Sequence, residues 1–544
     1  MPQNSIKAYK HLSYCAIILV MFFLLPLIMN AKWGTVSGLM TNNSDLFGST
    51  MIRGVVFSLI TSVISVLIAF ILASSLRKVS VISTASKWLS LLFIPFFLGN
   101  VSVAFIFKIL FLQSDIMSFA YSSSLKLYLI LGLIQMWQFS SLFTYLFWLS
   151  FQSISNNKIE YALNARMSKW EFQRDVVIPH AKNMLILLFL LAFIFNFYED
   201  AKLTLIFRAS QGTGSELISQ WLYRNFRADI LINFDYASTK VFSTSLYIII
   251  PLILVLVFLS ISLFNKGILE LCRNRINLVK NHFSNKSKKI KTNLIIFLLV
   301  VIIVLPIILS FISLGKISFS NSILKLAEPA YLTALATIAS SVFAILFAIS
   351  SRLAWPNKMN SFNNFSSFYI SILFVLLIVP PIALMVSGFY WIRILDISGI
   401  GSITTFWLLG HCFLTLPILG SFLLINHFRV SENELIFHKV HKSRAIDVIK
   451  YSFTKRFRME YVLTFIFAFS LIWNEAVLNR VFSDSIPSFV SAIIRTINSR
   501  SADFSVGFAY FCVSLLLALI CMTLWIFVIK KAQKSLIADE KVRS

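Results

Sequence analysis

The chain has 544 residues, of which 58% are hydrophobic and 13% charged, and its mean hydropathy is +0.83. Soluble domains carry about 25% charged residues, so this composition excludes an ordinary soluble protein. The formal net charge of +26 would fit a nucleic-acid-binding protein only if the positive residues formed one solvated patch, and they do not.

Twelve apolar runs of about 20 residues follow one another, each long enough to cross a hydrocarbon core of about 30 Å. They lie at 12–30, 54–76, 88–111, 127–151, 184–203, 241–264, 294–313, 330–351, 368–391, 402–426, 461–479 and 506–529. No small-residue cleavage site follows Asn30, so we interpret the first run as a retained helix, with a signal anchor as the alternative. The sequence predicts an all-α, polytopic membrane protein with about 12 transmembrane helices.

The positive residues are distributed unevenly between the segments that join these runs. With the N-terminus in the cytoplasm, most Lys and Arg fall on the cytoplasmic side, including those of "NKSKKIKTN" (285–293) and "KRFR" (455–458). This is the positive-inside bias, which indicates orientation and contact with a lipid bilayer, not nucleic acid. The five cysteines show no paired spacing, so neither a disulfide framework nor a metal site is predicted.

The chain repeats itself at an offset near 275. "SLITSVISVLIAFILASSLR" (58–77) aligns without gaps on "TALATIASSVFAILFAISSR" (333–352). Each half then holds six runs, and because six is even, both halves have the same orientation. We expect a first repeat at 1–264, a basic cytoplasmic linker at 265–293, a second repeat at 294–531 and a cytoplasmic tail at 532–544.

The longest polar passage of the first half is "IEYALNARMSKWEFQRDVVIPHAKN" (159–183). Asn157 with Glu160 forms a capping-box pattern, and Ser168 with Glu171 repeats it, so two short helices are predicted, the second running toward Pro179. Apolar contacts are expected from Ala162, Ala165, Trp170, Phe172, Val176 and Ile178. Taken alone, the passage fits equally well an amphipathic anchor at the bilayer surface.

The spacing of Glu160, Ala162 and Pro179, nineteen residues after the glutamate, resembles the EAA loop of ABC importer permeases. In that family the loop has Glu-Ala-Ala, a glycine six residues after the glutamate and a hydrophobic-x-hydrophobic-Pro ending, and its helix docks on a cytoplasmic ATPase. A blurred copy, "ELIFHKVHKSRAIDVIKYSF" (434–453), stands between the same runs of the second half. The resemblance covers the whole chain as a fused, two-permease polypeptide, similar to bacterial iron(III) and thiamine importers.

What the resemblance implies is a type I ABC importer permease fold in the bacterial inner membrane, with cytoplasmic termini and loops at 157–182 and 430–456. It assigns ATPase coupling to Glu160, Ala162, Ala165, Arg166, Ser168, Trp170, Ile178 and Pro179, and in the second copy to Glu434, Val440, Ser443 and Phe453. Expected partners are two copies of the ATPase subunit and an extracytoplasmic binding protein. Ferric iron is favoured as substrate, then thiamine, with polyamine, phosphonate or sugar open.

The loops depart from the family pattern at several positions. Tyr161 replaces the first alanine, and Arg166 stands where the family has glycine. Glycine allows a positive φ that arginine resists, so we expect the turn to move to Met167–Ser168. In the second copy, Val440 takes the glycine position and Phe453 the proline position, so unequal docking of the two loops is expected.

The chain contains no G-x-x-x-x-G-K-[ST] phosphate loop. We therefore expect no enzymatic activity and no cofactor on this chain, with ATP and magnesium on the partner ATPase. A membrane enzyme that acts on lipid is a rival class, but the sequence shows no catalytic constellation for it. A proton- or sodium-coupled secondary transporter is the alternative function, since that class uses acids or broken helices near the midplane.

Three acidic residues near the ends of apolar runs are candidates for the solute path. Glu199 and Asp200 end the fifth run, and Glu475 ends the eleventh, 39 and 41 residues after the respective loop glutamates Glu160 and Glu434. In the family these runs line the path, so the acids would face a cationic substrate; the alternative is an ordinary charge at the outer interface. His411, in the tenth run, is expected to be a satisfied helix–helix contact.

Overall fold

The structure is a computed structural model. It describes residues 44–77, 88–207 except 113, 153, 155 and 200, then 217, 220–221, 286–314, 327–354, 400–427, 440–441, 445–475 except 474, and 504–541. Every regular element in these ranges is a helix, so the prediction of an all-α chain is confirmed there.

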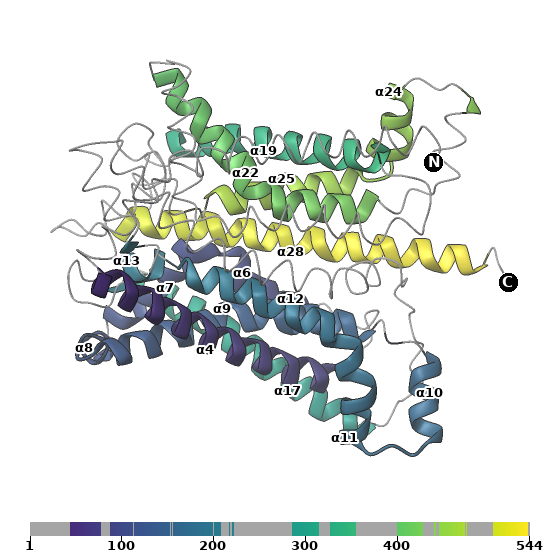
Figure 1. Cartoon of the computed structure of the whole chain (residues 1–544), viewed down its shortest axis with the longest axis horizontal. Helices are drawn as coiled ribbons and strands as arrows, with labels where there is room; N and C mark the ends of the chain where they lie inside the picture. Colours follow the sequence, from purple (N-terminus) through teal and green to yellow (C-terminus); the bar gives the residue numbers. More distant parts are fainter. Residues whose placement is uncertain are drawn as a thin grey trace. The chain divides into compact units, whose positions relative to one another are not determined.

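The helices of the first half are α4 (Ser44–Leu76), η2 (Ser90–Phe93), α6 (Ile94–Phe97), α7 (Gly99–Leu112), α8 (Ile116–Tyr121), α9 (Ser124–Gln152), α10 (Asn156–Asn164), α11 (Lys169–Phe172), the π-helical turn η3 (Gln173–Val177), α12 (Ile178–Phe197) and α13 (Ala201–Phe207). Those of the second half are α17 (Lys286–Leu314), α19 (Ala327–Ala354), α22 (Ile400–His427), α24 (Ala445–Val448), the π-helical turn η4 (Ile449–Thr454), α25 (Arg458–Trp473) and α28 (Phe504–Lys541). Figure 1 labels most of them.

Among the described residues, five helices are long and apolar enough to cross a membrane, and seven if each of two bent pairs is one span. The chain thus has the helices of a membrane protein. Nine of the twelve predicted runs coincide with described helices, whereas 12–30, 241–264 and 368–391 lie outside the described residues. Helix α17 begins within the expected linker, and α28 continues through most of the expected tail.

The chain folds into two compact units whose composition does not follow the order of the sequence. Unit 1 comprises Met1–Met51, Leu217–Asn265 and Leu324–Arg495; unit 2 comprises Ile52–Glu216, Lys266–Ile323 and Thr496–Ser544. Helices α17 and α28, from the second half of the sequence, therefore belong to the unit built by α4 to α13. In unit 1, helices α19, α22 and α25 pack against one another.

A proline explains how α17 is attached to unit 2. Pro306 lies inside α17 and has no N–H, so the carbonyl of Ile302, four residues earlier, loses its intrahelical partner. The indole N–H of Trp137 in α9 donates a hydrogen bond to that carbonyl at 3.1 Å. The bond between the two helices satisfies a backbone group that the proline would otherwise leave unpaired.

Helix α28 is attached to the same unit by close packing. Phe508 and Phe511 of α28 contact Phe311 of α17, with ring centroids 5.5 and 5.2 Å apart. Gly507 lies directly against the buried ring of Phe105 in α7. The absence of a side chain at Gly507 is what allows α28 to approach α7.

The helix boundaries of the two halves recur at nearly constant spacing. Helices α9 and α22 end at Gln152 and His427, 275 positions apart, and α12 and α25 end at Phe197 and Trp473, 276 apart. In both halves a short α-helix and a π-helical turn precede the last of these helices. This recurrence agrees with the offset near 275 read from the sequence.

The third predicted run, 88–111, is not one straight helix. Gly99 has a φ of 71°, and the helices on its two sides, Ser90–Phe97 and Gly99–Leu112, meet at 88°. A positive φ suits glycine because it lacks a Cβ. The run therefore bends sharply beside Asn100, a residue of the buried polar cluster described below.

Candidate functional site

The polar passage of the first half forms two short helices, α10 and α11, which lie outside the bundle (Figure 1). These helices, the π-helical turn η3 and the first turn of α12 are here called the 156–182 loop. Helix α10 ends in a Schellman motif: the Met167 N–H donates to the Ala162 carbonyl at 3.1 Å, and the Arg166 N–H to the Leu163 carbonyl at 3.0 Å. Arg166 itself has a φ of 49°. The expectation that arginine moves the turn to Met167–Ser168 is therefore wrong, because two backbone hydrogen bonds fix the left-handed residue at position 166.

This geometry makes a prediction about stability. A side chain in the left-handed region costs roughly 1–2 kcal/mol that glycine does not incur. We expect Arg166→Gly to stabilise the loop by about 1 kcal/mol after the greater flexibility of glycine in the unfolded chain is counted. Hydrogen exchange of the α10 amides should slow. Asn164→Gly, in the last helical position of α10, is the control and should speed exchange; faster exchange in Arg166→Gly would contradict the assignment.

Helix α11 begins with the predicted capping box. The Ser168 N–H donates to a Glu171 carboxylate oxygen at 2.6 Å, and the Glu171 N–H donates to the Ser168 hydroxyl at 3.2 Å, which confirms the prediction for this pair. The hydrogen bond from the Ser168 backbone lowers the pKa of Glu171. The cap is therefore complete at neutral pH and weakens when the pH falls through this lowered pKa and the carboxylate is protonated. The first predicted pair differs: α10 already begins at Asn156, so Asn157 and Glu160 lie inside the helix.

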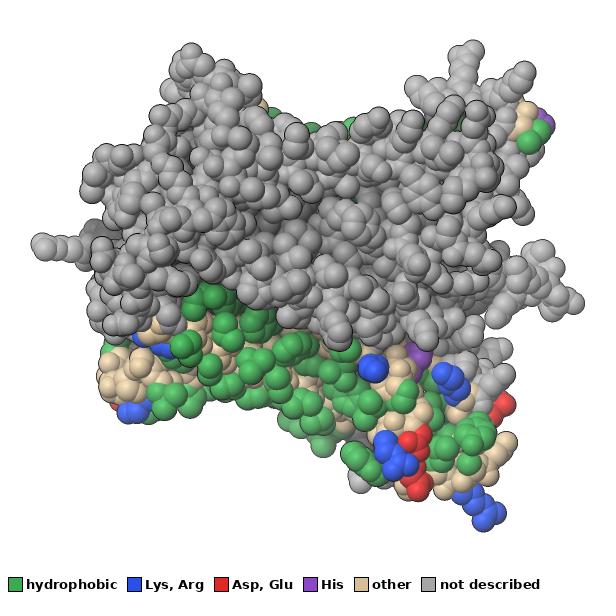
Figure 2. Space-filling view, viewed as in Figure 1, with side chains coloured by type: hydrophobic (Ala, Val, Ile, Leu, Met, Phe, Trp, Pro, Cys, Tyr) green, Lys and Arg blue, Asp and Glu red, His purple; other side chains and the backbone are tan. Residues whose placement is uncertain are grey.

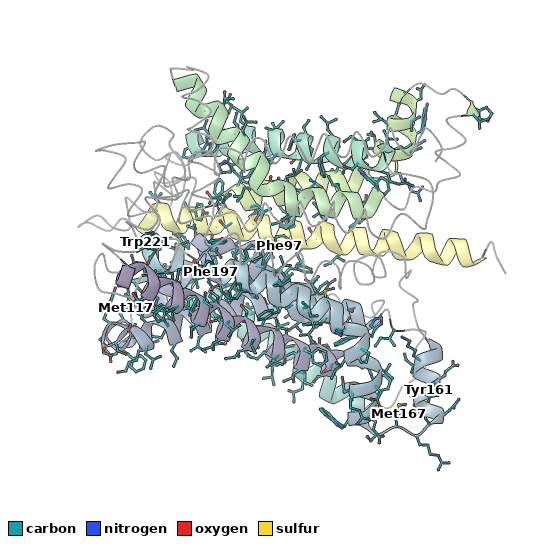
Figure 3. The ribbon with its side chains drawn as sticks, in the orientation of Figure 1. Phe97, Met117, Tyr161, Met167, Phe197 and Trp221 are labelled. Atoms are coloured by element: carbon teal, nitrogen blue, oxygen red, sulfur yellow. The ribbon has the colours of Figure 1, made fainter. Side chains whose placement is uncertain are left out.

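Most of the predicted coupling residues of the first loop are accessible. Glu160, Ala165, Arg166, Ser168, Trp170, Ile178 and Pro179 are exposed, whereas Ala162 is buried. Tyr161 and Trp170 expose about two thirds of their surface, 66% and 68%. Figure 3 labels Tyr161 on α10 and Met167 in the turn, and Figure 2 shows charged side chains gathered around this loop, beside the hydrophobic flank of unit 2. The loop thus presents apolar and charged groups together.

Two contacts tie the loop to the bundle. The guanidinium of Arg77, directly after α4, lies 4.1 Å from the ring centroid of Phe172 in α11. The His180 ring nitrogen Nε2 lies 3.2 Å from the Ser150 carbonyl in α9. The loop leads through the π-helical turn η3 into α12, which begins at Ile178. Pro179 fits the first turn of that helix, where its missing N–H leaves no hydrogen bond unmade.

The loop of the second half repeats this succession with α24, η4 and α25. Val440 is 71% exposed, and Phe453 is fully buried. Phe453 is the penultimate residue of η4, and its correspondence to Pro179 of the first loop stays a prediction. Glu434 and Ser443 lie outside the described residues.

A buried polar cluster in unit 2 contains Glu199. Its carboxylate forms an ion pair with the Lys202 ammonium at 2.7 Å, and both side chains are inaccessible to solvent. The Gln135 amide donates to the same carboxylate at 2.6 Å, and the ammonium donates to the Gln135 and Asn100 amide oxygens, both at 3.0 Å. The other Glu199 oxygen accepts the Lys202 backbone N–H at 2.9 Å, capping α13.

Neither sequence interpretation of Glu199 describes this environment. It is not an exposed charge at the end of a helix, because α12 ends at Phe197 and Glu199 lies within the bundle beside Gln135. Its charge is balanced by Lys202, three residues later in the sequence. Gln135 and Asn100 were missed, since nothing local marks an amide that pairs across 64 or 102 positions. Asp200 lies outside the described residues.

His411 differs from the expected helix–helix contact. The ring is fully buried in unit 1, and Nδ1 lies 2.8 Å from the Trp407 carbonyl of its own helix. In the part of the chain that the structure describes, Nε2 has no hydrogen-bond partner. Glu475, half-buried beyond the end of α25, donates its N–H to the Ile472 carbonyl at 3.2 Å.

Comparison of the chain with protein-family models, with curated proteins and with solved structures finds no match.

Proposed function

We propose that this chain is the membrane-embedded subunit of a binding-protein-dependent ABC importer. In this role it forms the solute path and is coupled to separate cytoplasmic ATPase subunits. The observation that carries the proposal is the exposed 156–182 loop, with its Schellman end and capping box, which leads into the apolar helix α12 through a bend of 62° between Lys182 and Met184. The recurrence of the short helix, π-helical turn and apolar helix in the second half supports two such couplings.

The contacts of the loop explain how a partner would move the bundle. A partner that covers the exposed face of α10 displaces α11 with it, because only the tight turn at Arg166 separates them. Arg77 and His180 then transmit the displacement to α4 and α9. Closure of an ATP-bound ATPase pair would in this way open the path outward, and loss of ATP would reverse it.

The remaining parts of the proposal follow from the resemblance. The chain would lie in the bacterial inner membrane with cytoplasmic termini and receive its solute from an extracytoplasmic binding protein. Ferric iron, thiamine and polyamine remain the candidate substrates. Hydrolysis of ATP would take place on the partner, with no catalytic role for this chain.

Charge reversal at Glu160 tests the coupling. Glu160→Lys should leave the amount of protein in the membrane unchanged but lower ATP-dependent uptake and co-purification of a P-loop ATPase more than tenfold, since a like-charge contact in an interface costs several kcal/mol. Lys158→Glu, an exposed charge reversal about 200° around the same helix, is the control and should have a much smaller effect. Normal uptake by a well-inserted Glu160→Lys variant would exclude the loop from coupling.

One observation favours the secondary-transporter alternative. The bend at Gly99 lies beside Asn100, and Lys202 follows the gap between α12, which ends at Phe197, and α13, which begins at Ala201. The Asn100–Lys202 hydrogen bond joins these two interruptions at a buried ion pair, an arrangement that resembles the broken helices of ion-coupled carriers. Uptake by proteoliposomes separates the two functions. Dependence on internal ATP and ATPase supports the importer, and uptake driven by a proton or sodium gradient alone supports the carrier.

A further inference from the structure

The last residue of α22, His427, lies in a cluster of aromatic rings that come from the second loop and the helix after it. Its side chain is inaccessible to solvent. The centroid of its ring lies 5.1 Å from that of Phe453, 5.0 Å from that of Phe457 and 5.7 Å from that of Tyr461. Nε2 shares a hydrogen bond of 3.0 Å with the Tyr461 hydroxyl. Because a buried polar group is costly unless it is hydrogen-bonded, this bond holds the imidazole against Tyr461.

The three rings belong to one helical segment. Phe453, Phe457 and Tyr461 follow one another at intervals of four residues, so their side chains lie on the same face of a helix. The Phe457 N–H donates to the Phe453 carbonyl at 2.9 Å, and the Tyr461 N–H donates to the Phe457 carbonyl at 3.0 Å. These bonds join the π-helical turn η4 to α25, so the end of the second loop and the helix that follows it form one body.

His427 therefore connects the two ends of the second loop. The chain leaves α22 at this residue and returns through η4, which carries Phe453. The opposite side of the returning segment is exposed at Lys455 and Arg458. A force applied to that exposed side reaches α22 as well as α25, because the buried side chain of one helix is bonded to the other.

The first half joins the corresponding helices through a different histidine. His180, the third residue of α12, has its Nε2 atom 3.2 Å from the Ser150 carbonyl in α9. At the spacing of 275 that relates the ends of α9 and α22, His427 corresponds to Gln152 and not to a histidine. The two halves thus use unrelated positions to connect the helix before the loop with the helix after it. This recurrence favours a role for the connection itself over chance packing.

We propose that His427 is a positioning residue for the second loop: its hydrogen bond to Tyr461 closes the base of the loop, so that α22 and α25 move together when an ATPase docks. The inference rests on the proposed importer function and gives the second loop a firm attachment although it departs from the family pattern. A phenylalanine at position 427 would fill the aromatic cluster but could not form the bond, which separates the role of the hydrogen bond from that of packing.

Hydrogen exchange of the full chain in phosphatidylcholine nanodiscs tests this attachment without any ATPase. His427→Phe should make the amides between 449 and 457 exchange about fivefold faster, the effect of losing one net hydrogen bond. Tyr461→Phe should do the same. The double variant should exchange no faster than either single variant, because all three lack the same bond.

Two further variants control for packing and for surface changes. His427→Gln should restore slow exchange, since an amide can donate to a hydroxyl or accept from it. Tyr451→Phe, at a tyrosine of η4 that is 55% exposed, should exchange as the wild type does. Unchanged exchange in both His427→Phe and Tyr461→Phe, or effects of the two that add in the double variant, would overturn the attachment.

ATP-dependent uptake tests the positioning role. His427→Phe should lower uptake at least fivefold with an unchanged amount of protein in the membrane, and His427→Gln should recover most of it. Faster exchange combined with normal uptake would overturn the role of His427 in coupling. Uptake by the wild type that does not depend on ATP would refute the importer instead, and the exchange measurements would still decide whether His427 closes the loop.

Discussion

Lys202→Met should destabilise the protein by about 3–5 kcal/mol, the cost of leaving a buried charge without its partner. The variant keeps the length of the side chain and removes the ammonium, so the Glu199 carboxylate loses its counter-ion in a position that solvent does not reach. The readout is a fall in Tm in detergent, together with a lower amount of folded protein in the membrane.

A double variant separates the loss of charge balance from the loss of packing. Glu199→Gln with Lys202→Met removes both charges and should recover most of the stability, because a neutral amide at position 199 can still pair with Gln135. Lys182→Met, at an exposed lysine of α12, is the control and should change Tm very little. Equal losses in the single and the double variant would show that the ion pair does not determine stability here.

Gly507→Ala should destabilise unit 2 by about 1–3 kcal/mol although alanine is the better helix former. A Cβ at this position would lie 2.3 Å from Cε2 of Phe105 and 2.9 Å from two further ring atoms, and the ring is only 1% exposed. Helix α28 must therefore move away from α7, or the ring must leave a packed position. Tm measures the loss.

The controls for Gly507 come from the same unit. Gly132→Ala in α9 adds a Cβ whose nearest neighbour is 3.6 Å away, so it should be neutral or stabilising by up to about 1 kcal/mol. Adding Phe105→Leu to Gly507→Ala should restore part of the loss, since the shorter side chain vacates the overlap. A stabilising Gly507→Ala would mean that α28 does not pack on α7 at this residue.

The sequence predicted the parts of this fold that depend on local pattern. Apolar runs predicted helices. The capping box was recognised because a serine followed three residues later by a glutamate, as at Ser168 and Glu171, is the pair that forms the two capping hydrogen bonds. The left-handed Arg166 was not foreseen, since a weak preference of one side chain was overruled by two backbone hydrogen bonds. The bend at Gly99 was also missed, because composition does not distinguish a straight apolar helix from a bent one.

The polar cluster and the composition of the two units could not be predicted for a different reason. Asn100, Gln135 and Lys202 meet only after α7, α9 and α13 have packed, so no window of sequence contains their relation. Likewise, an apolar run shows that a helix will be buried in lipid or protein, but it does not show which neighbours it takes. The assignment of α17 and α28 to unit 2 is such a choice of neighbours, and the sequence of each run does not contain it.

The exchange of helices has a consequence for how the chain is made. A ribosome has to synthesise more than 500 residues before α28 can join the unit that α4 begins, so this unit spends most of its synthesis incomplete. The ion pair and its amide partners all lie between Asn100 and Lys202, so they can form their hydrogen bonds early in synthesis. Phe105 can pack against Gly507 only after α28 has been made. Until then the apolar faces that α28 will cover can contact lipid tails at little cost, because lipid tails are as apolar as leucine. Nascent chains arrested after α13 should therefore be stable in the bilayer but open to unwanted association along the faces that later helices cover.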